Sequence, residues 1–151
     1  MTDAKIEEAK QLAGQRAVAD HFRDTFEYIG IGSGSTIIYV VDAIKNTIGS
    51  NPDALSRMKF VPTGYQSRQV IVQAGLTSIA FDSLSSEQML DVAFDGADEV
   101  DEDLNCIKGG GACLFQEKLV AMRAKRFICV AGMLTSPIFS PSSIRVFGSS
   151  N

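Results

Sequence analysis

The sequence has few cysteines, and it lacks the long apolar runs that build membrane-spanning segments. Its cysteines, Cys106, Cys113 and Cys129, are odd in number and form no C-x-x-C pair, so a reducing compartment is the simplest interpretation. The N-terminus is charged and lacks the apolar core of a signal peptide, and no apolar run approaches the ~18 residues of a membrane span. These absences predict a cytoplasmic protein with no membrane partner.

Positive charge is also scarce. The formal net charge is −4, whereas a general nucleic-acid binder needs a basic face, so we expect no nucleic-acid partner. This charge still allows a locally basic pocket for a phosphate group. The apolar content of 45% and the charged content of 21% are normal for a globular protein, and 151 residues can form one domain with a core. We interpret the single histidine, His21, as structural or exposed rather than catalytic.

Functional groups are concentrated between Asp95 and Lys118. An apolar run from Leu90 to Phe94, broken only by Asp91, leads directly into Asp95-Gly-Ala-Asp-Glu, which places carboxylates where a strand ends. Open α/β sheets bind their ligands at that end. The chain then reaches Lys108 and three glycines, followed by a helical pattern that contains Glu117. Glycines let backbone N–H groups approach an anion, and the helix adds its positive N-terminal end to the same place.

A second glycine-rich segment, Gly30-Ile-Gly-Ser-Gly-Ser-Thr36, lies between a short strand pattern and a helical pattern. This order is the geometry that captures phosphate at a helix N-terminus. The pattern is weak alone, because it lacks the Gly-Lys-Ser/Thr of a Walker A loop and the last glycine of a dinucleotide fingerprint. The alternative is a simple turn in which Ser35 or Thr36 caps the helix.

Together, Asp95-Gly-Ala-Asp-Glu, Lys108-Gly-Gly-Gly-Ala and Gln116-Glu-Lys resemble ribose-5-phosphate isomerase of the A type, and Gly30–Thr36 resembles the phosphate-side loop of that family. The resemblance covers about residues 1–131. It implies the interconversion of D-ribose 5-phosphate and D-ribulose 5-phosphate in the non-oxidative pentose phosphate pathway. It also implies no cofactor and no metal, and a homo-oligomer in the resembled family.

Such a reaction needs a base, hydrogen-bond donors that stabilise the enediolate oxygen, and groups that bind the phosphate. Glu117 is the candidate base, because a carboxylate can accept a proton and return it. Lys108 and the glycine amides after it would stabilise the anion, and Asp95 and Asp98 would hold sugar hydroxyls or assist ring opening. The resemblance places a phosphate-reaching lysine near Lys10. The candidate substrate-binding residues are Lys10, Ser33, Gly34, Ser35, Thr36, Asp95, Gly96, Ala97, Asp98, Lys108, Gly109, Gly110 and Gly111.

Each assignment has a plainer alternative. Glu117 could simply favour the positive end of its helix, Asp95 could terminate a strand, and Lys10 and Lys108 could be solvated surface charges. The joint spacing of the motifs is what favours the functional interpretation over these alternatives.

Alternating strand and helix patterns predict an α/β fold, a Rossmann-like parallel sheet flanked by helices. Residues 46–56 are predicted to be a polar connection. The expected strands are Tyr28–Gly32, Met58–Pro62, Thr77–Phe81, Leu90–Phe94 and Arg126–Ala131. The expected helices are Asp3–Phe22, Ile37–Ile44, Ser67–Ala74 and Gln116–Lys125.

The character of the sequence changes after residue 131. The resembled family continues there with Ala-Asp-x-Ser-Lys, whereas Ala131-Gly-Met-Leu lacks both the aspartate and the lysine. Residues 132–151 are rich in serine and show no clean period, so we expect a domain over residues 1–131 and a poorly ordered tail after it. This pattern predicts a truncated version of the fold with low stability and little isomerase activity.

Two other functions compete with the isomerase. The same loops could bind a sugar phosphate without turnover, as a regulatory fragment would. The acids of residues 95–103 could instead hold a divalent cation, although they lack the order of an EF-hand loop and contain neither His nor Cys. We rank the cation site last.

Overall fold

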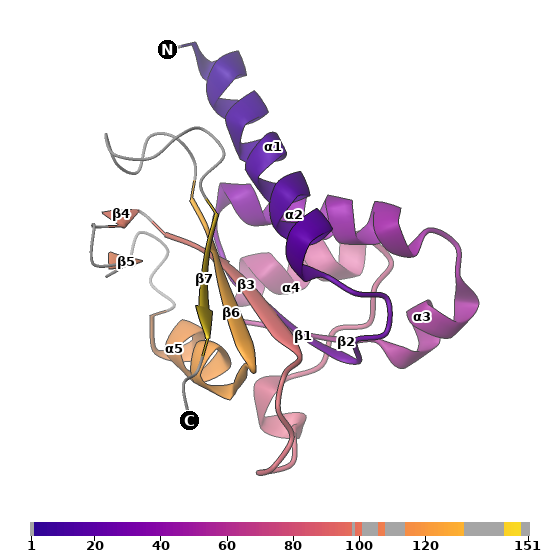
Figure 1. Cartoon of the computed structure of the whole chain (residues 1–151). Coiled ribbons are helices and arrows are strands. Elements are labelled where there is room, and N and C mark those ends of the chain that lie inside the picture. Colours follow the sequence, from indigo (N-terminus) through magenta and orange to yellow (C-terminus); the bar gives the residue numbers. More distant parts are fainter. Residues whose placement is uncertain (1, 98, 101–105, 108–113, 132–143, 149–151) are drawn as a thin grey trace.

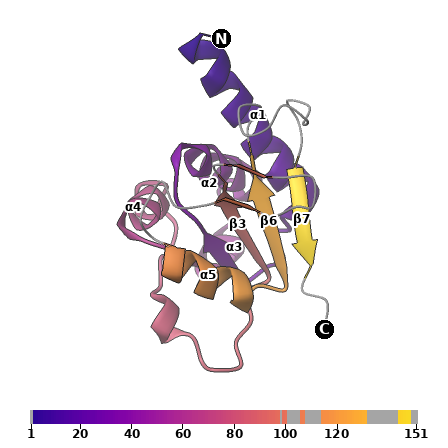
Figure 2. The ribbon, with the colours of Figure 1, turned by 90° about the vertical axis from the view of Figure 1, so that its left-hand side faces the viewer.

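The protein forms a five-stranded sheet with helices on both faces, as Figures 1 and 2 show. The computed structural model describes residues 2–97, 99–100, 106–107, 114–131 and 144–148. The strand order is β2-β1-β3-β6-β7, in which the first four strands are parallel and β7 runs antiparallel to β6. The strands of this sheet are β1 (Tyr28–Ile31), β2 (Lys59–Pro62), β3 (Val92–Gly96), β6 (Arg126–Val130) and β7 (Ile144–Gly148). The predicted α/β class is confirmed.

The larger of two apolar clusters lies under the helices that precede β3. These helices are α1 (Asp3–His21), α2 (Ser35–Ile48), α3 (Pro52–Arg57) and α4 (Tyr65–Gln73), whereas α5 (Leu114–Arg123) follows β3. Side chains of α1, α2, α3 and α4 pack in this cluster against Ile29, Ile31 and Phe94 of the sheet. The apolar stripe of α2, which repeats every three or four residues, is fully buried there, as its period predicts.

The smaller cluster lies on the opposite face of the sheet, under α5. Side chains alternate between the two faces along a strand, so Gly30 faces away from its neighbours Ile29 and Ile31. A Cβ on Gly30 would lie 2.6 Å from Cγ1 of Val120 and 2.8 Å from Cβ of Ala93. The absence of a side chain at Gly30 therefore lets α5 lie close to the sheet.

The strand predicted over Thr77–Phe81 is wrong. Within it the structure has only an isolated parallel bridge between Phe60 and Ser78, and a 3-10 helix begins at Phe81. Ile79 and Phe81 pack against the smaller cluster, so burial without a ladder explains their apolar character. Two short strands outside the main sheet, β4 (Glu99–Val100) and β5 (Cys106–Ile107), form an antiparallel pair.

Part of the segment expected to be poorly ordered forms β7. Residues 144–148 pair with all of β6, from Ile144 opposite Val130 to Gly148 opposite Arg126. An unpaired β6 would expose a row of backbone donors and acceptors, and β7 satisfies them. The division of the chain into a domain of residues 1–131 and a tail stays a prediction.

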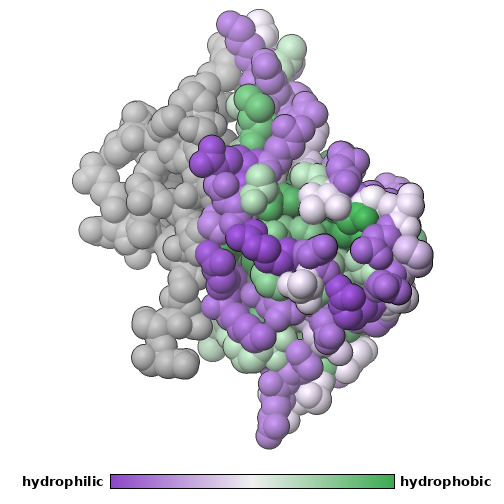
Figure 3. All heavy atoms as spheres, turned by 45° about the vertical axis from the view of Figure 1, so that its right-hand side comes forward, coloured by the Kyte–Doolittle hydropathy of each residue, from purple (hydrophilic) through white to green (hydrophobic). Residues whose placement is uncertain are grey.

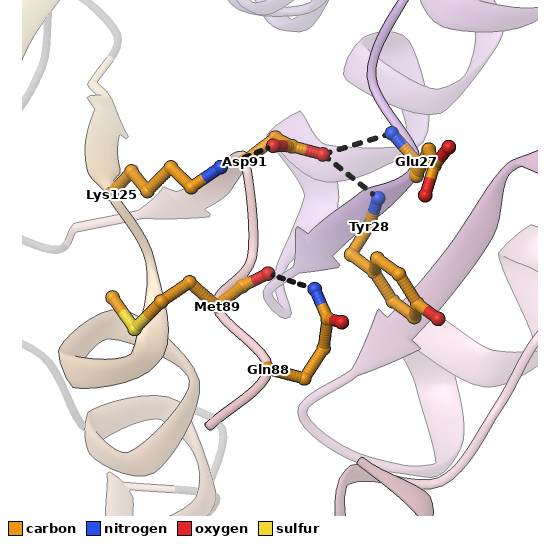
Figure 4. Close-up of polar contacts among 6 residues, drawn as sticks. All are labelled: Glu27, Tyr28, Gln88, Met89, Asp91 and Lys125. Carbon is orange, nitrogen blue, oxygen red and sulfur yellow. Dashed lines mark hydrogen bonds and ion pairs between the residues drawn. The ribbon is translucent and has the colours of Figure 1, made fainter. Parts of the chain in front are cut away.

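A carboxylate joins the segments that lead into three strands. Asp91 Oδ2 accepts hydrogen bonds from the amides of Glu27 (2.8 Å) and Tyr28 (3.1 Å), and Oδ1 accepts one from Nζ of Lys125 at 2.9 Å (Figure 4). These contacts tie the entries of β1, β3 and β6 together, at the edge of the sheet opposite the predicted site.

The view in Figure 3 shows a mostly hydrophilic surface with apolar residues in scattered patches. Within the described part of the chain, none of the helices combines the length and the apolar character needed to cross a bilayer.

Candidate functional site

The order of the strands reverses between β1 and β3. From β1 the chain moves to β2 on one side, and it later returns to β3 on the other side of β1. Neighbouring connections leave the carboxyl ends of β1 and β3 in opposite directions, which is where open α/β sheets bind ligands. Gly32 and Ser33 follow β1 at this point, and Asp95 lies in β3.

The loop after β1 lies directly on the Asp95 carboxylate. Gly32 donates its amide to the Phe94 carbonyl at 2.8 Å, and Ser33 donates its amide to Asp95 Oδ1 at 3.3 Å. A Cβ on Gly32 would lie only 2.0 Å from Asp95 Oδ1. Only a glycine lets the backbone approach so closely, and the Asp95 side chain is 2% exposed beneath it.

Ser33 connects this loop to the candidate base. Its hydroxyl donates a hydrogen bond to Oε1 of Glu117 at 2.5 Å, although 84 residues separate the two in the sequence. Glu117 lies in the first turn of α5 and is 6% exposed. Asp95, Ser33 and Glu117 therefore form one hydrogen-bonded group contributed by β3, the β1 loop and α5.

The loop continues into the N-terminus of α2. Gly34 has φ +104°, a left-handed conformation that favours glycine, and it precedes the helix without a side-chain cap. Ser35 and Thr36 are the first two residues of α2, and the amides at a helix start lack partners within the helix. This end of α2 therefore offers N–H donors and positive potential to an anion.

Lys10 lies on α1, which rises beyond the sheet on the side where the parallel strands end (Figures 1 and 2). Its Nζ lies 2.8 Å from Oε1 of Glu7, and the Tyr39 hydroxyl donates to the other oxygen of Glu7 at 2.6 Å. Both hydrogen bonds, with that from Lys10 the stronger influence, hold the pKa of Glu7 below its usual value. A phosphate group would compete with Glu7 for Lys10.

The other predicted site residues follow β3 or lie outside the described residues. Gly96 donates its amide to Oδ1 of its neighbour Asp95 at 2.8 Å, and Ala97 comes directly after β3. The candidates outside the described residues are Asp98, Lys108, Gly109, Gly110 and Gly111. Among the described residues, no group of three or more His, Cys, Asp or Glu side chains could hold a metal ion.

One residue that contacts this loop is not among the predicted site residues. Gln66, near the start of α4, accepts a hydrogen bond from the Gly34 amide at 2.8 Å and donates one to the Gly34 carbonyl at 3.2 Å. A polar residue in a helical pattern carries no sequence signal for such a contact, because the contact depends on how α4 packs beside the loop.

The pattern of the ribose 5-phosphate isomerase A (phosphoriboisomerase A) family matches residues 59–134, just over half of the chain. The chain belongs to this family. It is 49% identical over 128 residues to the ribose-5-phosphate isomerase of Candida albicans, a match that covers 85% of this chain and 50% of that protein. With the human ribose-5-phosphate isomerase it shares 48% identity over 130 residues, which cover 86% of this chain and 40% of the human protein.

Solved structures of this family have the same fold. The ribose 5-phosphate isomerase of Plasmodium falciparum matches with a TM-score of 0.75 and 28% identity, over 85% of this chain and 52% of that one. A D-ribose-5-phosphate isomerase solved in complex with phospho-erythronic acid matches with a TM-score of 0.71 and 35% identity, over 85% and 52% of the two chains. The chain thus spans about half the length of the relatives that it matches.

Proposed function

We propose that this site carries out the interconversion of D-ribose 5-phosphate and D-ribulose 5-phosphate. The observation that carries the proposal is the hydrogen bond between Ser33 and Glu117 beside the buried Asp95, at the carboxyl ends of β1 and β3. It joins the glycine-rich segment after β1 to α5, around a buried carboxylate, in a protein of the ribose 5-phosphate isomerase A family.

In the proposed reaction, Glu117 moves one proton. The Glu117 carboxylate takes the proton from C2 of the open-chain aldose, and the electrons of the broken C–H bond form the C1–C2 double bond of an enediolate. Glu117 then returns the proton to C1, while the hydroxyl proton on C2 is transferred to the oxygen on C1, which yields the ketose. No atom is gained or lost, so neither an oxidant nor a metal is required by this scheme.

The remaining residues would hold the substrate around this base. Asp95 and Asp98 would accept hydrogen bonds from sugar hydroxyls, and Lys108 with the amides of Gly109–Gly111 would stabilise the enediolate oxygen. The start of α2 at Ser35 and Thr36, with Lys10, would bind the phosphate. The complex of a structural relative with phospho-erythronic acid supports a phosphorylated sugar or sugar acid as the ligand.

A second candidate is binding of a sugar phosphate without turnover. The observation that favours it is the sequence Ala131-Gly-Met-Leu, which stands where the resembled family has an aspartate and a lysine. A chain that binds phospho-erythronic acid and leaves ribose 5-phosphate unconverted would have this second function.

The test is to replace Glu117 with Gln and to measure the conversion of ribose 5-phosphate together with the binding of phospho-erythronic acid. We expect conversion to fall about 10²- to 10⁴-fold, because Gln keeps the shape of Glu but cannot carry the proton. Binding should change little. The matched control is Glu87→Gln, the same change at an exposed residue for which the structure shows no side-chain hydrogen bond among the described residues. Conversion by Glu117→Gln within a few-fold of the parent would remove Glu117 from this role.

A further inference from the structure

Three consecutive amides of the β1–α2 loop are held by three different acceptors. Gly32 donates to the Phe94 carbonyl, Ser33 to the Asp95 carboxylate and Gly34 to the Gln66 side chain. The first two acceptors belong to β3, whereas Gln66 is an exposed residue of α4. Within the described part of the chain, the next amides, those of Ser35 and Thr36 at the start of α2, have no such acceptor.

Gln66 contacts the loop with both ends of its amide. Its Oε1 accepts from the Gly34 N–H at 2.8 Å, and its Nε2 donates to the Gly34 carbonyl at 3.2 Å. If the Gln66 amide were turned over, its NH₂ would face the Gly34 N–H and its oxygen would face the Gly34 carbonyl. Neither pair can form a hydrogen bond, so the backbone of Gly34 determines the orientation of the Gln66 amide. The side chain thus fixes both polar groups of one residue, as a neighbouring strand would.

Gly34 is the loop residue that most needs such support. Its φ of +104° lies in a region that glycine enters easily, and a Cβ there would meet no atom of the described residues within 4 Å. Gly34 makes no side-chain cap for α2, and besides Gln66 its carbonyl accepts the Ile37 amide at 3.3 Å. A glycine loses more conformational entropy than other residues when it becomes ordered.

We propose that Gln66 is a positioning residue that presets Gly34 and, through it, the start of α2 for binding the phosphate of the substrate. The inference rests on the proposed function, since it concerns the phosphate end of the same site. Gln66 itself does not touch the reacting carbons. Because it orders the loop before the ligand arrives, its loss should weaken binding of substrate and transition state equally.

The experiment compares Gln66→Met with Gln73→Met in the 151-residue chain. Met keeps the length of Gln and removes both hydrogen bonds, and Gln73 is an exposed residue at the other end of α4. Calorimetry would give the Kd for phospho-erythronic acid, and kinetics would give KM and kcat for ribose 5-phosphate. Hydrogen exchange of the Gly34 amide, followed by NMR, reports directly on the bond to Gln66.

For Gln66→Met we expect Kd and KM to rise about 3- to 30-fold, the effect of one or two exposed hydrogen bonds. We expect kcat to stay within about twofold of the parent and the Gly34 amide to exchange faster, while Gln73→Met behaves like the parent. Parent-like Kd in Gln66→Met would overturn the inference, and so would a fall in kcat with KM unchanged. Failure of the parent itself to bind phospho-erythronic acid would overturn the proposed phosphate site, and this inference with it.

Discussion

The absence of a side chain at Gly32 determines where the Asp95 carboxylate lies. Gly32 allows the loop to lie on the Asp95 carboxylate, where a Cβ would be 2.0 Å from Oδ1 and 2.1 Å from Cγ. Gly32→Ala should therefore push Asp95 out of place or distort the loop. We expect a loss of about 1–3 kcal/mol in the free energy of unfolding, measured by urea denaturation, since overpacking a close contact costs this much.

A matched control for this change is Gly96→Ala at the same edge of the sheet. Among the described residues, the nearest atom to a Cβ on Gly96 is the Ser33 carbonyl oxygen at 3.5 Å, which is an ordinary contact. This variant should keep the unfolding free energy of the parent within about 0.5 kcal/mol. Equal losses in Gly32→Ala and Gly96→Ala would contradict the steric explanation.

The pKa of Asp91 predicts how the stability of the fold depends on pH. Burial opposes the ionisation of its carboxyl, but the hydrogen bonds from the Glu27 amide, Lys125 and the Tyr28 amide outweigh burial, so the pKa of Asp91 lies below its usual value. A depressed pKa in the folded state adds stability above the unfolded pKa of about 3.9, and this stability is lost as the pH falls through the folded pKa. Asp91→Asn should cost about 1–3 kcal/mol at pH 7.

The check is urea unfolding of the parent and of Asp91→Asn at pH 7 and at pH 3. The gap between the two proteins should be narrower at pH 3, because below the usual pKa of an aspartate the Asp91 side chain takes up a proton more readily in the unfolded state than in the folded state. Asp82→Asn is the control, since the structure shows no side-chain hydrogen bond of this exposed residue within the described part of the chain. A gap that stays constant with pH would show that the charge of Asp91 contributes nothing.

The residues of the site differ in how far the sequence could predict them. Glu117 and Asp95 lie in motifs with specific spacing, and the structure places them on one hydrogen-bonded network through Ser33. Their roles stay predictions. Gln66 could not be predicted, because its contact with Gly34 depends on the packing of α4 against a loop 32 residues away in the sequence.

Among the elements, α5 depends on Gly30 for its position. Val120 of α5 would lie 2.6 Å from a Cβ on Gly30, so Gly30→Ala should push α5, and Glu117 with it, away from the sheet. We expect a loss of about 1–3 kcal/mol in stability and reduced conversion of ribose 5-phosphate. Adding Val120→Ala should restore part of the Gly30→Ala loss, since it removes the nearest obstacle.

A double-mutant cycle of Gly30→Ala and Val120→Ala measures this relief. Substitutions at two residues in contact give an interaction free energy of about 0.5–3 kcal/mol, whereas the stability changes of substitutions at independent residues simply add. Simple additivity of the two changes would contradict a direct contact between α5 and the sheet at Gly30.

The elements themselves were predictable where their period was strong. The stripe of α2 repeats with the period of a helix, and all its members are buried. The structure contains α3 where the sequence predicted a polar connection, although Asn51 caps it and Pro52 occupies its first turn. A helix of six residues is too short to show a period, so only these capping residues could have indicated it.

In the molecule as a whole, the strand order brings three segments that are distant in the sequence to the carboxyl ends of β1 and β3. The β1 loop, the end of β3 and the start of α5 meet only because β1 lies between β2 and β3. The spacing of the sequence motifs predicted that these segments contribute to one site. The hydrogen bond that joins Ser33 to Glu117 spans 84 residues and could not be derived from spacing alone.

The most direct test of this site follows the proton on C2 of ribose 5-phosphate by NMR in D₂O. A proton that Glu117 has removed from C2 can exchange with D₂O before it is returned, so repeated removal and return would replace it with deuterium even where net conversion is slow. We predict loss of the C2 proton signal with the 151-residue chain, and a rate about 10²-fold or more lower in Glu117→Gln, which still binds phospho-erythronic acid. Exchange at the parent rate in Glu117→Gln, or no exchange by a parent chain that binds the ligand, would contradict the proposed role of Glu117.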